Sequence, residues 1–249
     1  MGDKKTAFST IIIAAGKGTR MKSDIAKVLH PLGGVPLLSW PIKAAREAGS
    51  SRIVVVIGHQ GERIRALFQE PDLIFVEQKE LLGTGHAVLQ AQNAFPGQSA
   101  EVVILCGDVP LIKPATIRAL YEKRKTDRAA VTVLTTVVAE PAGYGRVIKS
   151  GDGRVARIVE EKDATGEEKL VREINTGIYC VESQFLFAAV AGLDDKNAQR
   201  EYYLTDIVAI ACQKGLRATS LTVSDPAEVA GINTPEDLQR AALVIANRP

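Results

Sequence analysis

Four runs of aliphatic residues divide the chain, and each has the length of a buried strand. They cover residues 8–14, 52–58, 101–106 and 129–138. Within them apolar residues follow one another without polar alternation, as in Ile53-Val54-Val55-Val56-Ile57. Uninterrupted runs of this kind are typical of central strands in a parallel sheet that is covered on both faces.

Segments with a helical period lie between and after these runs. Residues 37–48 keep one apolar stripe, and Pro41 is compatible with that helix only in its first turn. Residues 84–95 keep another stripe, with Thr84 as the predicted N-cap. The last helix is predicted to begin at Thr234-Pro235. This alternation predicts an α/β fold with a doubly wound, mostly parallel central sheet of the Rossmann-like kind.

The pattern changes between about residues 140 and 182. Short apolar stretches there are separated by turns such as Ser150-Gly151-Asp152-Gly153. We interpret this segment as a β-rich insertion that forms part of the functional site. Since no linker, low-complexity tract or repeat occurs, residues 1–249 are predicted to form a single domain.

Composition and charge exclude several classes of protein. With 31 basic and 29 acidic residues the formal net charge is +2, so no global field attracts nucleic acid or anionic lipid. The three cysteines are spread through apolar stretches, as is typical of buried, reduced thiols: Cys106, Cys180 and Cys212. No stretch reaches the ~20 apolar residues of a membrane helix. A cytoplasmic protein with no nucleic-acid or membrane partner is therefore expected.

A glycine-rich loop, Ala14-Ala15-Gly16-Lys17-Gly18-Thr19-Arg20-Met21, follows the first predicted strand. Backbone amides at such a position converge on phosphate oxygens. A dinucleotide fingerprint would need glycine in place of Met21, and a P-loop would need Ser or Thr in place of Gly18. Lys17, Arg20 and the nearby Lys27 add positive charge that suits a triphosphate.

Two further motifs lie next to predicted elements. Gly107-Asp108 follows the third strand, where a carboxylate lies in the crevice of an α/β sheet and can hold a divalent cation. Gly83-Thr84-Gly85-His86 opens a helix whose free amides could bind a nucleotide. His86 is interpreted as structural.

The ordered motifs resemble one family, the uridylyltransferase domain of bacterial N-acetylglucosamine-1-phosphate uridylyltransferases, within the sugar-nucleotidyltransferase superfamily. The resemblance covers nearly the whole chain. Besides the motifs above it rests on Lys27-Val28-Leu29-His30, Gly143-Tyr144-Gly145-Arg146, residues 160–163, Glu173-Ile174-Asn175-Thr176-Gly177 and residues 201–206. Cys106 departs from the pattern, since better-known members often carry tyrosine there.

The resemblance implies a role for each matched residue. Nucleotide binding falls to Ile13, Ala14, Ala15, Gly16, Gly18, Gln78, Gly83, Thr84 and Gly107. Arg20, Lys27 and Asp108 would be catalytic, with the two cations on the phosphates. The N-acetylglucosaminyl group would contact Gly145, Glu160 and Asn175. Asp108 and Asn233 would ligate Mg²⁺.

The implied reaction joins UTP and N-acetylglucosamine-1-phosphate into UDP-N-acetylglucosamine and pyrophosphate. A sister enzyme with another sugar or nucleotide is the nearest alternative, and a catalytically silent nucleotide-binding regulatory module is another. Many members also carry an acetyltransferase β-helix built of hexapeptide repeats. The sequence has no six-residue period, so we expect no such domain in this chain.

Overall fold

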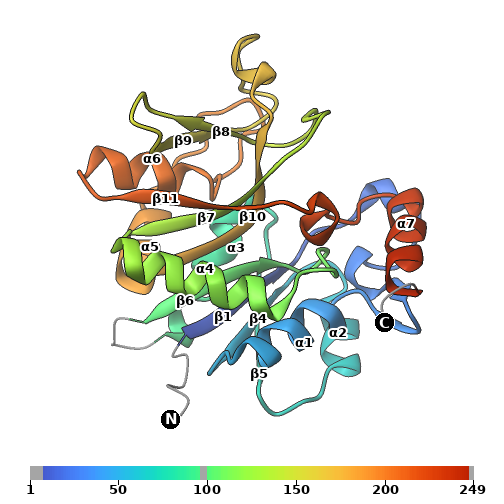
Figure 1. Cartoon of the computed structure of the whole chain (residues 1–249). Helices are drawn as coiled ribbons and strands as arrows, with labels where there is room; N and C mark the ends of the chain where they lie inside the picture. The colour runs from blue at the N-terminus through green and yellow to red at the C-terminus, as the bar shows by residue number, and fades with distance from the viewer. Residues whose placement is uncertain (1–7, 96–99, 247–249) are drawn as a thin grey trace, which may run out of the picture.

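A mixed β-sheet runs through the centre of the molecule (Figure 1). The computed structural model describes residues 8–95 and 100–246. The strands of the central path lie in the order β11-β7-β10-β6-β1-β4-β5. Their bounds are β1 Phe8–Ala14, β4 Ile53–Ile57, β5 Leu73–Glu77, β6 Glu101–Cys106, β7 Val131–Val137, β10 Glu173–Glu182 and β11 Ala218–Val223.

The four predicted strands are confirmed as β1, β4, β6 and β7, although β7 begins two residues later than expected. β1 pairs in parallel with both β4 and β6, and β7 pairs in parallel with β11. The predicted mostly parallel, doubly wound sheet is therefore confirmed. β10 is the exception, because it runs antiparallel to its neighbours β6 and β7.

The order of the strands creates a crevice at one edge of the sheet. From β1 the chain moves outward to β4 and β5, and it then returns to the other side of β1 as β6. Such a reversal is a topological switch point, where α/β sheets bind ligands beyond the carboxyl ends of their strands. The loops after Ala14 and Cys106 therefore border the expected crevice.

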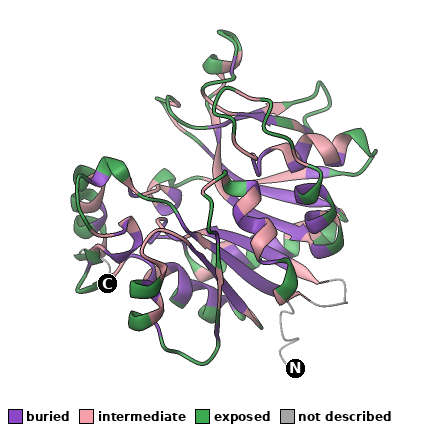
Figure 2. Cartoon of the chain, turned by 180° about the vertical axis from the view of Figure 1, so that it is seen from behind, coloured by how far each residue is buried: buried purple, intermediate pink, exposed green. Residues whose placement is uncertain are grey.

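Helices cover both faces of the sheet. One apolar cluster joins the sheet to α1 (Ser39–Ala48), α2 (Gly61–Leu67) and α4 (Pro114–Asp127). A second cluster, on the other face, joins it to α3 (Thr84–Gln90), α5 (Ser183–Ala191) and α6 (Asp206–Gln213). In β1 Ile12 belongs to the first cluster and Ile11 to the second, as strand alternation requires. Figure 2 shows the strands buried between helices with exposed outer surfaces.

The expected β-rich segment contains a hairpin and the long strand β10. β8 (Arg146–Lys149) and β9 (Val155–Val159) pair antiparallel, and β8 also pairs with β10 where Arg146 faces Ile174. Because β10 lies within the central sheet, only the hairpin protrudes from it. A small separate ribbon is formed by β2 (Pro31–Leu32) and β3 (Val35–Pro36).

Two details of the predicted helices need correction. The N-cap of α3 is Gly83 instead of Thr84, and the helix ends at Gln90, followed by a short 3-10 turn over Gln92–Ala94. Gly83 has φ +113°, and a Cβ there would lie 2.7 Å from the Tyr202 carbonyl oxygen. Glycine therefore takes the cap position, because the closely passing chain leaves no room for a side chain.

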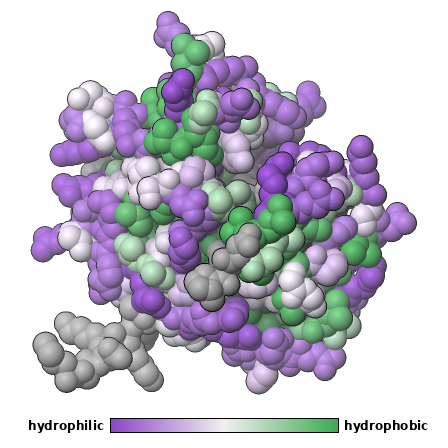
Figure 3. All heavy atoms as spheres, turned by 45° about the vertical axis from the view of Figure 1, so that its right-hand side comes forward, coloured by the Kyte–Doolittle hydropathy of each residue, from purple (hydrophilic) through white to green (hydrophobic). Residues whose placement is uncertain are grey.

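The C-terminal helix α7 (Pro235–Ala246) begins where predicted. It packs against the segment before α1 through a third apolar cluster that includes Met21, Leu37 and Ile232. A cavity of about 530 Å³ lies beside it, lined by Leu111, Val229 and Leu243 among others. On the side that Figure 3 brings forward, apolar patches are interrupted by hydrophilic residues. In the described part of the chain, no helix is long and apolar enough to cross a membrane.

Candidate active site

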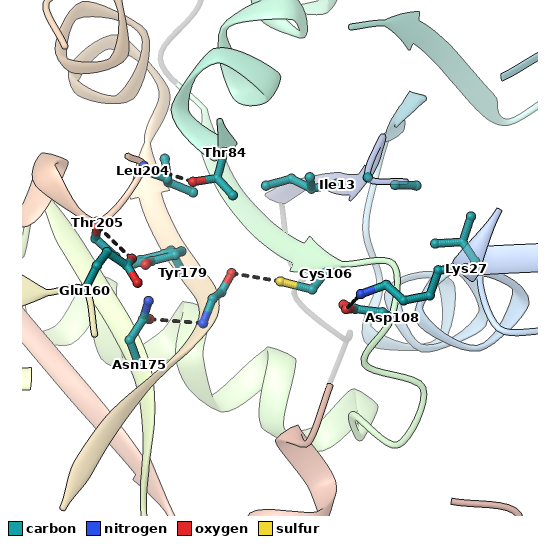
Figure 4. Close-up of a pocket in the computed structure, with 14 residues that line it drawn as sticks. Ile13, Lys27, Thr84, Cys106, Asp108, Glu160, Asn175, Tyr179, Leu204 and Thr205 are labelled. Carbon is teal, nitrogen blue, oxygen red and sulfur yellow. Dashed lines mark hydrogen bonds and ion pairs between the residues drawn. The ribbon is translucent and has the colours of Figure 1, made fainter. Parts of the chain in front are cut away.

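A pocket of about 240 Å³ lies beyond the carboxyl ends of β1 and β6 (Figure 4). Its walls come from both halves of the chain. The lining residues are Ile13, Ala14, Gly16, Lys27, Val28, Thr84, Cys106, Asp108, Glu160, Asn175, Gly177, Tyr179, Leu204 and Thr205. The pocket therefore occupies the crevice that the strand order predicts.

The glycine-rich loop and the end of β6 form the floor of the pocket. The Gly107 amide donates to the Ile13 carbonyl oxygen at 2.9 Å, and a Cβ on Gly107 would lie 3.0 Å from that same oxygen. Gly18 has φ +64°, and a Cβ there would lie 2.4 Å from the Cβ of Lys27. Glycine at these two positions allows the loop and the Lys27 segment to approach each other closely.

Two cations and two oxygen ligands meet at one end of the pocket. The Lys27 ammonium donates to Asp108 Oδ2 and, at 2.9 Å, to Asn233 Oδ1. Arg20 donates to the same Asn233 oxygen at 2.9 Å. Lys27 and Asp108 are both mostly buried, with side-chain exposures of 15% and 20%. The structure thus brings together four residues from three distant parts of the sequence.

The start of α7 holds Asn233 in place. The Ile232 amide donates to the Asp108 carbonyl oxygen at 2.8 Å, which ties the C-terminal segment to the end of β6. Asp237 Oδ2 accepts from the amides of Asn233 and Thr234, each at 2.9 Å, and the Asp237 amide donates to Thr234 Oγ1. This reciprocal capping fixes the first turn of the helix and the residue before it.

The donor set at this end fits a hard divalent cation. The Asp108 carboxylate and the Asn233 amide oxygen already converge on one positive charge, the Lys27 ammonium. In the described residues there is no group of three or more His, Cys, Asp or Glu side chains that could hold a metal ion. Mg²⁺ binds through few carboxylates and retains water or phosphate oxygens, so these two residues would suit it in the presence of a phosphate ligand.

A carboxylate and an amide lie at the opposite end of the pocket. Glu160 follows β9, and its Oε1 accepts a hydrogen bond from the Thr205 hydroxyl at 3.1 Å. The Asn175 amide nitrogen of the backbone donates to the Gly145 carbonyl oxygen at 2.8 Å. A Cβ on Gly145 would lie 3.5 Å from both the Asn175 Cβ and Glu160 Oε2, so these three residues form one wall.

Burial and neighbouring acids shift the pKa values of the side chains that form this wall. Desolvation raises the pKa of Glu160, partly offset by the Thr205 hydroxyl, and the nearby charges of Asp206 and Asp163 raise it further. Burial likewise raises the pKa of the Tyr179 phenol well above its ordinary value, so that group stays neutral. This end of the pocket therefore presents a carboxylate whose ionised form burial disfavours, beside a neutral phenol, and both can form hydrogen bonds with a polar ligand.

The start of α3 forms a third wall, and hydrogen bonds from Gln78 and Leu204 hold it in place. Gln78 is buried, and its side-chain amide donates to the Gly83 carbonyl oxygen at 3.0 Å and lies 3.0 Å from His86 Nδ1. Thr84 Oγ1 accepts from the Leu204 amide at 3.1 Å. The predicted structural role of His86 agrees with this contact, because its ring holds the side chain of Gln78.

Cys106 faces Gly177 across the pocket. Its thiol lies 3.4 Å from the Gly177 carbonyl oxygen, and burial raises its pKa to about 12. Gly177 has φ +76°, and a Cβ there would lie 2.8 Å from the sulfur. Cys180 is buried, while Cys106 and Cys212 are only partly so, and all three are free thiols.

The predicted site residues fall into two groups. Ile13, Ala14, Gly16, Lys27, Thr84, Asp108, Glu160 and Asn175 line the pocket. Ala15, Gly18, Gln78, Gly83, Gly107, Gly145, Arg20 and Asn233 lie behind or beside them and act through the contacts above. Lys17 is exposed and lines no part of the pocket.

Sequence reasoning assigned no role to Tyr179, Leu204 or Thr205, although all three line the pocket. Tyr179 is an aromatic residue inside a strand, a pattern that predicts a position in the hydrophobic core. Thr205 is the residue before α6, which reads as a helix cap, but its hydroxyl donates to Glu160. Only the resemblance over residues 201–206 carried a signal for the last two.

Curated relatives match almost all of this chain. "Bifunctional protein GlmU" of Geotalea uraniireducens (strain Rf4) is 54% identical over 242 residues, which cover 97% of this chain and 53% of the relative. The protein of the same name from Geobacter sulfurreducens is 54% identical over 236 residues, or 94% of this chain and 50% of the relative. The chain thus spans about half the length of these relatives.

Solved structures share the fold at low sequence identity. A structure described as UDP-glucose pyrophosphorylase complexed with UDP-glucose has a TM-score of 0.78 and 18% identity, covering 98% of this chain and 100% of that one. A putative glucose-1-phosphate thymidylyltransferase from Bacillus anthracis has a TM-score of 0.77 and 20% identity, with coverages of 98% and 97%. Residues 10–176 match the family described as the MobA-like NTP transferase domain. This chain therefore belongs to that NTP transferase family.

Proposed function

We propose that this chain transfers UMP from UTP to N-acetyl-α-D-glucosamine-1-phosphate, giving UDP-N-acetylglucosamine and pyrophosphate. The observation that carries the proposal is the division of one pocket into two chemically different ends. Lys27, Asp108 and Asn233 gather charge and oxygen ligands at one end, while Glu160 and Asn175 form a polar wall at the other. A reaction between a triphosphate and a sugar phosphate needs both.

The nucleotide would bind along the floor and the α3 wall. Backbone groups of Ile13, Ala14, Ala15, Gly16 and Gly18 border the floor, together with Gly107. Gln78, Gly83 and Thr84 would hold the uracil base: Thr84 lines the pocket, and Gln78 lies behind it, fixed by its contacts with Gly83 and His86. A buried amide in one fixed orientation discriminates between bases better than a mobile one.

The sugar would bind against Gly145, Glu160 and Asn175. Thr205 holds the Glu160 carboxylate toward this wall, and the Asn175 backbone is fixed to Gly145. Hydrogen-bonding groups prepared in this way favour a ligand with matching hydroxyl and acetamide groups. An analogue that leaves them unpaired binds more weakly.

The chemistry needs alignment and charge neutralisation more than proton transfer. With a second pKa of about 6, the sugar phosphate is largely a dianion at neutral pH and can attack the α-phosphorus without a general base. Arg20 and Lys27 would offset the repulsion between the two anionic substrates and hold them in line. The reaction forms one P–O bond and breaks another, and pyrophosphate leaves.

Mg²⁺ would be held by Asp108 and Asn233. When bound, it neutralises charge on the phosphate oxygens and on the leaving pyrophosphate. The remaining coordination positions would be filled by the substrate and by water, because these two side chains supply few of the ligands that the cation requires.

A matrix of nucleotides and sugar phosphates tests the assignment. UTP, dTTP, CTP and ATP are each combined with N-acetylglucosamine-1-phosphate and with glucose-1-phosphate, and pyrophosphate release is measured with and without Mg²⁺. We expect the highest kcat/KM for UTP with the acetylated sugar. Faster turnover of another pair would overturn the substrate assignment but leave nucleotidyl transfer in place. No release from any pair would favour a silent nucleotide-binding module.

A further inference from the structure

The Lys27 ammonium lies between the two side chains that would ligate the metal. It contacts Asp108 Oδ2 and lies 2.9 Å from Asn233 Oδ1. The same ammonium is the group that the proposed reaction requires on the phosphates. Lys27 therefore has two possible sets of partners, namely these two oxygens and the phosphates of the proposed reaction.

A divalent cation and the ammonium exclude each other at these oxygens. Mg²⁺ binds oxygen at about 2.0–2.1 Å, and like charges at such separations repel strongly. The ammonium must leave before the metal can take both oxygens, and Arg20, which contacts Asn233 Oδ1 at 2.9 Å, must release that oxygen as well. Asp237 holds the Asn233 backbone amide, and the Asn233 side-chain nitrogen donates to the Gly231 carbonyl oxygen at 3.3 Å, so both contacts resist a movement of its Oδ1 away from Asp108.

The Lys27 backbone is held in place, so this change falls to its side chain. Its neighbours Val28 and Leu29 are buried, and the backbone at Lys27 lies against Gly18. The Ala26 amide is also tied, since it donates to the Gln60 side chain at 3.1 Å. Rotation about the side-chain bonds can therefore carry the ammonium from Asp108 toward the pocket, which Lys27 also lines.

We propose that Lys27 is a placeholder cation. In the absence of substrate its ammonium holds Asp108 and Asn233 together. When the phosphates bind, the ammonium moves to them and leaves the two oxygens to the metal. This inference deepens the proposed function, on which the identity of the phosphates rests. Metal binding and the movement of Lys27 are then one coupled exchange. By linkage, each phosphate ligand that engages Lys27 strengthens metal binding, and the metal strengthens phosphate binding equally.

Removal of the ammonium should strengthen metal binding by the substrate-free protein. We expect Lys27→Met to bind Mn²⁺ roughly 10-fold more tightly than the unaltered chain, as a coupling of ordinary size predicts. The free Mn²⁺ signal in electron paramagnetic resonance measures this directly. Lys17→Met is the matched control, because it removes the same charge at an exposed position on the neighbouring glycine-rich loop, and we expect a much smaller change.

An affinity of Lys27→Met equal to or weaker than that of the unaltered chain would overturn the proposal. An equal gain in Mn²⁺ affinity for Lys17→Met would also overturn the proposal, because the effect would then arise from the overall charge of the protein. Asp108→Asn should lower Mn²⁺ affinity in either background, which assigns the signal to this site. These titrations contain no nucleotide or sugar, so they stand whether or not UMP transfer is the reaction.

A second measurement uses the unaltered chain and does not depend on how a variant folds. The protein is treated with an amine-acetylating reagent with and without Mg²⁺ at the same ionic strength, and acetylation of each lysine is followed by peptide mass spectrometry. We expect Mg²⁺ to raise the rate at Lys27 several-fold and to leave Lys17 unchanged. An unchanged rate at Lys27, at a metal concentration that occupies the site, would contradict the exchange.

Discussion

Asp108 and Glu160 are carboxylates of one pocket in different surroundings. Asp108 faces the Lys27 ammonium and the Asn233 amide oxygen. Glu160 faces the Thr205 hydroxyl and lies near other acids, and burial raises its pKa. The first environment is suited to a cation, and the second to a neutral hydrogen-bonding ligand.

Asp108→Asn should reduce turnover by about 10²–10³-fold, the usual loss when one strong electrostatic contact is removed. The amide has nearly the shape of the carboxylate, so the fold should be retained. The measurement is pyrophosphate release at a series of Mg²⁺ concentrations, with circular dichroism as the check on folding. Asp195→Asn, at an exposed position outside the pocket, is the control. Normal turnover of Asp108→Asn at limiting Mg²⁺ would refute the ligand role.

Glu160→Gln should make the protein more stable at neutral pH and less able to bind the sugar phosphate. Because the folded state raises the pKa of Glu160, its ionised form is disfavoured there, and stability is lost as pH rises through that pKa. The neutral amide avoids this loss, which amounts to about 1.4 kcal/mol for each unit of pKa shift. The gain in melting temperature should be present at pH 7 and absent at pH 4.

The same substitution should raise KM for the sugar phosphate by roughly 10–100-fold, the loss of one charged hydrogen bond. Glu161→Gln is a matched control for which we expect the opposite change in stability. The Arg146 guanidinium lowers the pKa of Glu161, so this variant should lose stability at pH 7. A Glu160→Gln protein that is less stable than the unaltered chain at pH 7 would show that ionised Glu160 is favourably placed.

At the scale of elements, the first turn of α7 is also part of the site. Asp237 caps the helix and at the same time fixes the backbone of Asn233. A helix cap that fixes a residue proposed to ligate the metal would couple local stability to metal affinity. The loss of such a cap costs about 1 kcal/mol.

Asp237→Ala should therefore lower stability by about 1 kcal/mol and raise the Mg²⁺ concentration needed for half-maximal turnover. Glu236→Ala, in the same turn at an exposed position, removes the same charge without releasing the Asn233 amide. Denaturant unfolding and Mg²⁺ titration of both variants give the comparison. Equal Mg²⁺ requirements in the two variants would rule out a positioning role for Asp237.

Elements whose pattern is local could be predicted from the sequence. The aliphatic runs of β1 and β6 have the predicted bounds, because a buried parallel strand carries its signal in consecutive residues. The position of β10 could not be predicted in this way. Its pairing with β6 and β7 joins residues about 40 to 80 apart, and no local pattern encodes that choice.

The residues of the candidate site also divide into those placed by local pattern and those placed by long-range contacts. Gly16 and Asp108 follow strands directly, so strand prediction alone places them at the crevice. Asn233 meets Asp108 through the Ile232 contact and the shared Lys27 ammonium, and the sequence resemblance was needed to pair them. Tyr179 and Thr205 were missed because a hydroxyl in a strand or before a helix has common structural explanations. The misplaced cap at Thr84 has a similar cause, since Tyr202 passes close to Gly83.

At the scale of the whole molecule, one loop joins two walls of the pocket, the one at the start of α3 and the one that includes Glu160. Tyr202 donates through its amide to Leu82, Leu204 donates to Thr84, and Thr205 donates to Glu160. Residues 202–205 thus contact both the α3 wall and the sugar wall. A ligand that reaches both ends would draw on contacts from both halves of the sheet.

UDP-N-acetylglucosamine should therefore raise the melting temperature more than UMP at the same concentration. Each additional tenfold in affinity contributes about 1.4 kcal/mol, or roughly 3–6 °C for a protein of this size. Differential scanning fluorimetry measures the two shifts. In a Glu160→Ala, Asn175→Ala double variant, the two shifts should become nearly equal. Equal shifts in the unaltered chain would place the sugar outside the pocket.

The attachment of the β8–β9 hairpin has a consequence for how new specificities can arise. The hairpin joins the central sheet where Arg146 faces Ile174, and it bears Gly145 and Glu160 just outside its two strands. The phosphate loop, Asp108 and Asn233 belong to other parts of the chain. If the proposed sugar contacts are made here, an exchange of this hairpin, with compensating changes on the facing loop, would alter which sugar is accepted and leave the nucleotide half in place. Laboratory evolution of new sugar nucleotides could therefore begin at this hairpin.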